Sequence, residues 1–300
     1  MFGRYDIYHE IQALDPVTDH QKIVYLVGTM EYPWLIKKSL EFALFRTYAV
    51  PHTSRILKAT GQFGSHGQKR YDDTALMMSG IAEHGYDSEF AKIVIAQMNK
   101  LHGRYNLRNE DMLYVLSTFV FEPTRWHQKY GWRTPTRKEK LANFYFWREV
   151  GIRMGIKDIP EDYEVYERFN IKHEQTYFDY DEANRYIGEK TLEVFLSWFP
   201  APMRFLVRQA ALSLMDDKLL YAMGFEKPHA AVRSAVHYAL KIKGFLMRFL
   251  PPRRTPFIYT EIPSLTYPHG FDPHELGAKP EYGDLKAVED ARTPAKAIGD

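Results

Sequence analysis

Two short segments of the sequence hold side chains that could bind a metal or stabilise charge. In one of them, Ile95, Met98 and His102 share one helical face at i, i+3 and i+7 spacing. In the other, Arg70 and Thr74 lie four residues apart, so a helix would point both side chains the same way. A histidine on an apolar helix face is more often a hydrogen-bonded core residue than a metal ligand, so His102 alone leaves both interpretations open.

These residues belong to an ordered set of motifs. The two most distinctive are Arg70-Tyr71-x-Asp73-Thr74 and Met98-Asn99-x-Leu101-His102-x-Arg104-Tyr105. Further matching stretches are 42–48, 109–114, 121–126, 130–133 and 146–147. In this order they resemble the MpaB-like oxygenases, the family that shares its catalytic domain with the rubber oxygenase called latex clearing protein.

The resemblance implies a mostly helical haem b protein that uses dioxygen on a hydrophobic or prenylated, terpenoid-like small molecule. It also implies that His102 is the proximal iron ligand, and that Arg70 and Thr74 lie beside the haem. Hydroxylation and oxidative cleavage of a carbon–carbon double bond both remain open. Further candidates for contacts with the haem propionates or for lining the pocket, with core packing as the alternative for the aromatic ones, are Tyr71, Arg104, Tyr105, Trp126 and Arg133.

The residue types suit these roles. Haem iron binds a neutral imidazole, and an acceptor such as a backbone carbonyl usually holds the other ring nitrogen. A cation or a hydroxyl donor, such as Arg70 or Thr74, stabilises negative charge that develops on dioxygen. Arg70 could instead pair with a propionate or form a salt bridge, and Thr74 could be an ordinary helical or capping residue.

The sequence departs from the latex-clearing members at two places. Those members carry a lysine directly before the threonine, able to occupy the sixth iron position, whereas this sequence has Asp73 there. We therefore expect no lysine-capped resting form. Those members also use a glutamate upstream of the arginine as a candidate base, but no acidic residue lies between Glu41 and Asp72 here. Asp73 could act as a base if buried, or could serve the helix dipole near an N-terminus.

Composition excludes several other kinds of site. The 300 residues include no cysteine, which rules out disulfides, thiolate haem ligation and iron–sulfur clusters. A net charge of +2 gives no case for nucleic-acid binding. Apart from an oxygenase, the same features fit a non-catalytic haem sensor or carrier, or a helper that binds no haem.

Hydrophobic periodicity predicts an all-α fold. Helices are expected near 19–48, with an interruption at Pro33, and near 73–85, 88–104, 109–130, 134–155, 161–176, 179–198, 203–223 and 228–249. We expect one globular domain over 1–250, with the haem pocket between its helices. A proline-rich extended arm should follow over 251–300, docked by its aromatic residues as far as about Leu276 and disordered at its end.

Residues 228–254 combine helical apolar spacing with a strong positive charge. Such a basic amphipathic helix can lie in a membrane interface, but packing on the domain with a solvated basic face is the favoured interpretation. No secretory signal or spanning segment of ~20 apolar residues is visible, so a cytoplasmic protein is expected, with peripheral membrane contact as the variant. The oligomeric state is left open.

Overall fold

The regular elements of this protein are helices throughout the part that the structure, a computed structural model, describes: residues 3–278. The prediction of an all-α fold is confirmed. The elements in chain order are α1 (Asp6–Ala13), α2 (His20–Leu26), the π-helix η1 (Val27–Glu31), α3 (Pro33–Tyr48), α4 (Pro51–Ala59), α5 (Gln62–Ser65), α6 (Gly67–His84), α7 (Glu89–His102), α8 (Asn109–Tyr130), α9 (Arg137–Arg153), α10 (Tyr163–Tyr177), α11 (Glu182–Ser197), α12 (Ala201–Ser213), α13 (Asp217–Ala222), α14 (Ala230–Met247) and the 3-10 turns η2 (Tyr259–Glu261) and η3 (Pro273–Glu275).

The helix boundaries follow local signals in the sequence. Ser88 begins α7 by accepting a hydrogen bond from the Ala91 amide at 3.1 Å, and Thr136 forms a capping box with Glu139 at the start of α9. The stretch 203–223, predicted as one helix, is two helices. The break arises because the Asp216 side chain caps α13, accepting from the Leu219 amide at 3.0 Å.

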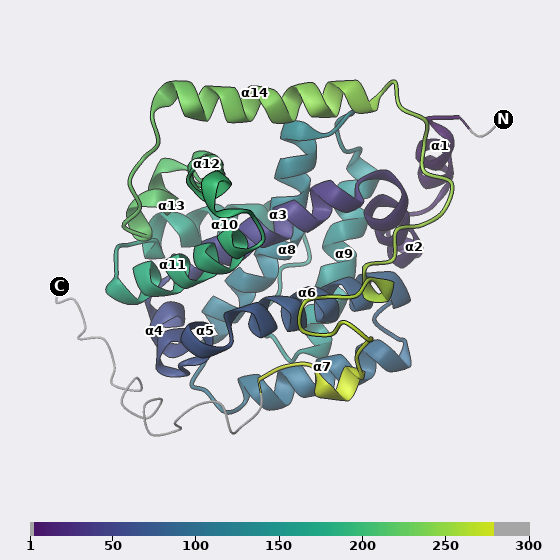
Figure 1. Ribbon diagram of the computed structural model, residues 1–300. Helices are drawn as coiled ribbons and strands as arrows, with labels where there is room; N and C mark the ends of the chain where they lie inside the picture. The colour runs from purple at the N-terminus through teal and green to yellow at the C-terminus, as the bar shows by residue number, and fades with distance from the viewer. Residues whose placement is uncertain (1–2, 279–300) are drawn as a thin grey trace.

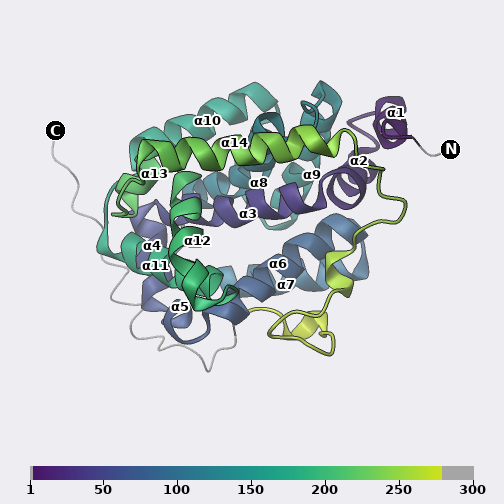
Figure 2. The ribbon, with the colours of Figure 1, turned by 45° about the horizontal axis from the view of Figure 1, so that its top comes forward.

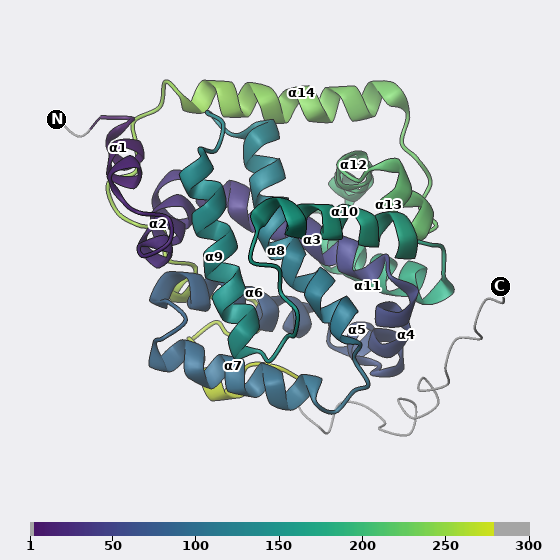
Figure 3. The ribbon, with the colours of Figure 1, turned by 180° about the vertical axis from the view of Figure 1, so that it is seen from behind.

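The centre of the molecule is the long pair α3 and α8, which pack along each other. Figure 1 shows α14 lying across one end of the molecule, with α6 and α7 at the opposite end. Seen from behind in Figure 3, α9 runs beside α8. Aromatic-rich clusters fill the spaces between these helices, one around α3, α8 and α11 and the other around α6 to α9.

The chain after α14 is extended and returns to the far end of the molecule, where it lies along α6 and α7 (Figure 2). We call residues 257–277 the docked arm. Its amides and hydroxyls donate to three carboxylates of α6: Thr266 to Asp72 at 2.9 and 2.5 Å, Tyr267 to Asp73 at 2.6 Å, and Tyr259 and Thr260 to Glu83 at 2.6–3.2 Å. Leu276 is 4% exposed, so the arm is fixed by packing as far as this residue. The predicted disorder of the chain end lies outside the described residues.

Candidate functional site

A cavity of about 280 Å³ lies among the helices α3 to α9 and α11. We call it the His102 cavity. Its walls are largely apolar and include Met77, Met98, Phe63 and Phe195. It gathers most of the residues that the sequence motifs singled out: Arg70, Tyr71, Asp73, Thr74, His102 and Tyr105.

His102 is the last residue of α7 and lines this cavity. Burial, and secondly the Arg70 cation, lower the pKa of its imidazole to about 4. The ring is therefore neutral at physiological pH, as a metal ligand must be. Its Nδ1 is buried and has no hydrogen-bond partner within residues 3–278, so the acceptor predicted for the second ring nitrogen is not found there.

Arg70 approaches the same cavity from α6. Its guanidinium carbon lies 6.0 Å from the centre of the Phe63 ring, and its Nε is buried without a hydrogen-bond partner in the described chain. No carboxylate of the described residues forms an ion pair with it. A cation left without a counter-charge beside an apolar cavity is poised to bind an anionic group.

Asp73 and Thr74 line the cavity, but their polar atoms are engaged elsewhere. The Asp73 carboxylate, 1% exposed, accepts from Lys69 Nζ at 2.8 Å and from the Tyr267 hydroxyl of the docked arm at 2.6 Å. Its negative charge is thus compensated within the protein, and it does not sit in the first turn of α6, which begins at Gly67. The Thr74 hydroxyl donates to the carbonyl oxygen of Arg70 at 2.9 Å.

Comparison with known proteins agrees with this arrangement. Residues 46–243 match the family described as ER-bound oxygenase mpaB/B′ and rubber oxygenase, catalytic domain. The chain belongs to this family. It is 30% identical to ER-bound oxygenase mpaB′ of Penicillium brevicompactum over 246 residues, which are 76% of this chain and 58% of that protein. It is 29% identical to ER-bound oxygenase mpaB of Penicillium roqueforti over 232 residues, 71% of this chain and 78% of that protein.

The matched region contains all the candidate site residues, and it begins after the first motif residues at 42–45. The chain spans little more than half the length of the mpaB′ relative. The family resemblance inferred from the motifs is confirmed.

Three of the candidate site residues do not line the His102 cavity. Trp126 packs in the core, with its ring centre 4.9 Å from that of Phe42. Arg133 forms ion pairs with Glu31 and Glu139, far from α7. Arg104 is half-buried just beyond α7; its amide donates to the Leu101 carbonyl oxygen at 3.2 Å, and its side chain has no hydrogen bond or ion pair with residues 3–278. The structure thus agrees with core packing, the alternative left open for Trp126, and places Arg133 in an ion-pair network outside the His102 cavity.

Tyr71 and Tyr105 both line the cavity. The Tyr71 hydroxyl donates to the buried carboxylate of Glu41 at 2.7 Å, and burial followed by the Glu41 charge raises its pKa far above the usual range. Tyr71 therefore stays protonated and contributes a ring edge to the cavity. Glu41 itself lies outside the cavity lining.

The sequence analysis missed the contribution of residues 60–67. Thr60, Gln62, Phe63 and Gly67 of this stretch line the cavity, although none of them belongs to the motifs that the sequence analysis singled out. No local sequence pattern indicates this role, because it depends on how α5 packs against α11.

The donor set fits a haem. No group of three or more His, Cys, Asp or Glu side chains within residues 3–278 could hold a bare metal ion, but haem iron needs only one protein nitrogen. The cavity offers a neutral imidazole, a guanidinium that has no ion pair among residues 3–278, and apolar walls. These are the partners that an iron, a propionate and a macrocycle require.

Proposed function

We propose that this protein is a haem b-dependent oxygenase that uses dioxygen to oxidise a hydrophobic small molecule, of the prenylated or terpenoid kind. The observation that carries the proposal is that His102 and Arg70 line one apolar cavity and that His102 Nδ1 and Arg70 Nε are buried atoms without a hydrogen-bond partner among residues 3–278. Membership of a family whose relatives are named oxygenases supports it.

When bound, haem b supplies the redox-active iron at which dioxygen is activated. His102 would hold the iron, since its low pKa keeps the ring nitrogen free of a proton. Arg70 would balance either a propionate or negative charge on the distal side. The methionine and phenylalanine side chains of the walls exclude water, which strengthens the electrostatic effect of Arg70.

Absorption spectroscopy of the purified protein tests the proposal. We expect a Soret band with one haem per chain, and its loss in His102→Ala. His84→Ala is the matched control, because His84 is exposed at the end of α6 and does not line the His102 cavity. Full haem content with an unchanged Soret band in His102→Ala would exclude the ligand assignment. Oxygen uptake with a prenylated test compound then separates an enzyme from a haem carrier, and product analysis separates hydroxylation from double-bond cleavage.

We further propose that the outer face of α14 contacts a membrane. Tyr238, Ile242 and Phe249 on and after this helix are 65, 56 and 72% exposed. The side turned to the protein carries Gly244, which packs against the backbone of Tyr130, and Leu240 and Met247, which pack on the core as the favoured interpretation expected. A second set of apolar side chains points outward and is exposed.

Charge supports a membrane with anionic lipids as the partner. The sequence has no acidic residue between Glu226 and Glu261, and the basic residues in this interval are Lys227, Arg233, Lys241, Lys243, Arg248, Arg253 and Arg254. Lysine and arginine beside an apolar helix face favour anionic headgroups. None of the described helices has the length and apolar character to cross a bilayer. The relatives named ER-bound agree with a membrane location.

Vesicle flotation tests this contact. Vesicles containing phosphatidylserine should carry the protein upward, and Phe245→Glu with Phe249→Glu should abolish this. Ile152→Glu, which changes a 46% exposed residue on α9, is the control and should bind as the wild type does. Equal flotation of the double variant would refute a role for α14.

A further inference from the structure

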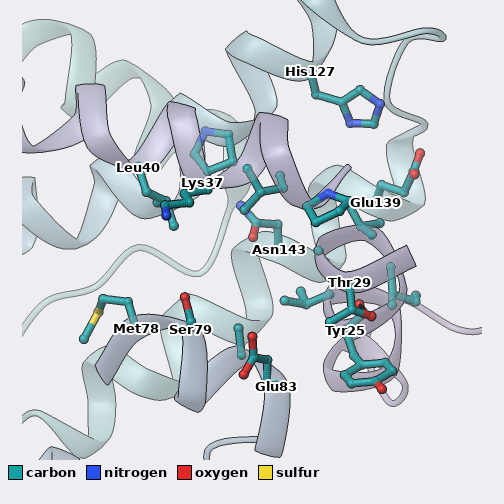
Figure 4. A pocket seen from close by; sticks show the side chains of 18 of the residues that line it. Tyr25, Thr29, Lys37, Leu40, Met78, Ser79, Glu83, His127, Glu139 and Asn143 are labelled. Atoms are coloured by element: carbon teal, nitrogen blue, oxygen red, sulfur yellow. Dashed lines mark hydrogen bonds between the residues drawn. The ribbon is translucent and has the colours of Figure 1, made fainter. Parts of the chain in front are cut away.

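A second cavity, of about 110 Å³, lies between α2, η1, α3, α6, α8 and α9 (Figure 4). It is lined mostly by aliphatic side chains such as Ile23, Val24, Ile36 and Leu40, and the docked arm closes it with Phe257 and Tyr259. Nothing in the proposed chemistry at His102 uses this space.

The two cavities meet at two side chains. Met78 of α6 and Trp147 of α9 line both of them. Trp147 also packs against Phe119, which lines the His102 cavity, with 4.8 Å between the ring centres. A methionine side chain has three rotatable bonds and adapts easily to a neighbouring group. Met78 can therefore move aside and join the two spaces.

The two carboxylates in the wall of the second cavity are already engaged by the protein. Glu139 is held by Arg133 at 2.6 and 2.8 Å, and Glu83 by the amides of the docked arm. Lys37 Nζ lies 4.3 Å from the centre of the Tyr259 ring. An occupant therefore meets an apolar interior with no free carboxylate, which suits an uncharged chain.

One buried polar atom in the wall remains without a partner. His127 is 3% exposed, and its Nε2 has no hydrogen-bond partner among residues 3–278. Burial lowers the pKa of His127 to about 3, so the ring is neutral. A neutral imidazole in this place can bond to a hydroxyl or carbonyl group at the end of a chain.

We propose that the second cavity receives the uncharged apolar chain of a substrate whose reacting part lies in the His102 cavity, with Met78 as the movable partition. This inference rests on the proposed function for the role of the His102 cavity. It adds the place where the apolar chain of that substrate lies, and an uncharged polar group at the end of the chain.

Gly28 offers a direct way to fill the second cavity. It lines the cavity, and a β-carbon added there would meet no atom within 4 Å. Gly28→Phe should therefore occupy the space without moving the backbone. Ala96→Phe adds the same ring to the exposed side of α7, away from both cavities, and is the matched control.

Farnesol, a C15 isoprenoid alcohol, is the probe, and its binding to the haem-loaded protein is measured by isothermal titration calorimetry. We expect saturable binding near one equivalent to the wild type and to Ala96→Phe, and at least tenfold weaker binding to Gly28→Phe. The Soret band should be the same in all three proteins. If Gly28→Phe does not fold, Ala82→Phe fills the cavity from the α6 wall instead.

Unchanged farnesol affinity in a folded filling variant would overturn the inference, as would displacement of haem by farnesol, because the probe would then occupy the His102 cavity. The two proposals fail separately. A protein that binds no haem, yet loses farnesol binding in Gly28→Phe, would refute the haem assignment and retain the second cavity. A protein with a full Soret band that binds no farnesol would refute the role of the second cavity and retain the haem assignment.

Discussion

The hydroxyl of Thr74 donates a hydrogen bond of 2.9 Å to the carbonyl oxygen of Arg70, one turn earlier in α6. The motif places these two residues on one face of a helix. In the structure, the only proton of the threonine hydroxyl is used in a hydrogen bond to the helix backbone. A hydroxyl used in this way cannot also donate to dioxygen unless the bond is broken.

Thr74→Val should therefore leave turnover per bound haem close to that of the wild type. Removal of a donor that acts on developing negative charge costs on the order of a hundredfold or more in rate, and we expect far less than this. Product formed per haem, measured at saturating substrate, checks the expectation. A hundredfold fall in product formed per haem would show that the Thr74 hydroxyl acts in catalysis.

Arg70→Ala should raise the pKa of His102 above its value of about 4, since the Arg70 cation is the second cause of the low value, after burial. Titration of the His102 ring by NMR in the haem-free protein measures this shift. An unchanged pKa would mean that Arg70 lies too far from His102 to influence the iron ligand. In the haem-loaded protein, lower haem occupancy with unchanged product per haem would assign Arg70 to a propionate.

The free energy of unfolding of the haem-free protein should fall as the pH is lowered from 7 to 5. His102 and His127 have folded-state pKa values near 4 and 3, below the usual 6.5, so the unfolded chain binds protons first and gains stability. Each ring should contribute roughly 2 kcal/mol to this loss. Urea unfolding at both pH values provides the measurement, and His127→Phe should show a smaller difference. An equal pH dependence in that variant would contradict the buried neutral state of His127.

Asp73→Asn should destabilise the fold by about 3 kcal/mol, because it leaves the Lys69 ammonium without its buried counter-charge. It should also loosen the docked arm, since Tyr267 and Lys69 both bond to Asp73. Limited proteolysis should then cut within 257–277 sooner than in the wild type. Tyr267→Phe, which removes only the 2.6 Å hydroxyl contact, should have a weaker effect in the same direction. A variant as resistant as the wild type would show that apolar contacts alone hold the arm.

The haem-loaded resting protein should have no amine at the sixth iron position. Lys69 is the lysine nearest in the sequence to the family's lysine position, and its ammonium is bound by Asp73, Tyr267 and the Gly277 carbonyl. An electron paramagnetic resonance spectrum dominated by low-spin, nitrogen-ligated ferric iron at neutral pH would contradict this.

Much of the fold could be predicted, because helix periodicity and capping are local. The prediction of a helix over 109–130 agrees with α8 at both ends. The motifs singled out His102, Arg70, Thr74 and Asp73, and all four line one cavity. Tertiary packing decided the remainder. Arg133 is next to Trp132 in a motif, but its partners Glu31 and Glu139 are set by the approach of η1 to α9. The outward apolar face of α14 could not be predicted either, since periodicity gives a helix face without saying which side the domain covers.

The docked arm determines when the site can be completed during synthesis. Thr266 and Tyr267 bond to Asp72 and Asp73 across a separation of 194 residues, and Phe257 and Tyr259 close the second cavity. The ribosome makes the chain from its N-terminus, so the helices that surround both cavities emerge before the segment that seals them. A nascent chain that ends before residue 257 therefore has an unsealed second cavity and two buried aspartates without their arm partners. The second cavity can therefore be closed only after residues 257–277 have been synthesised.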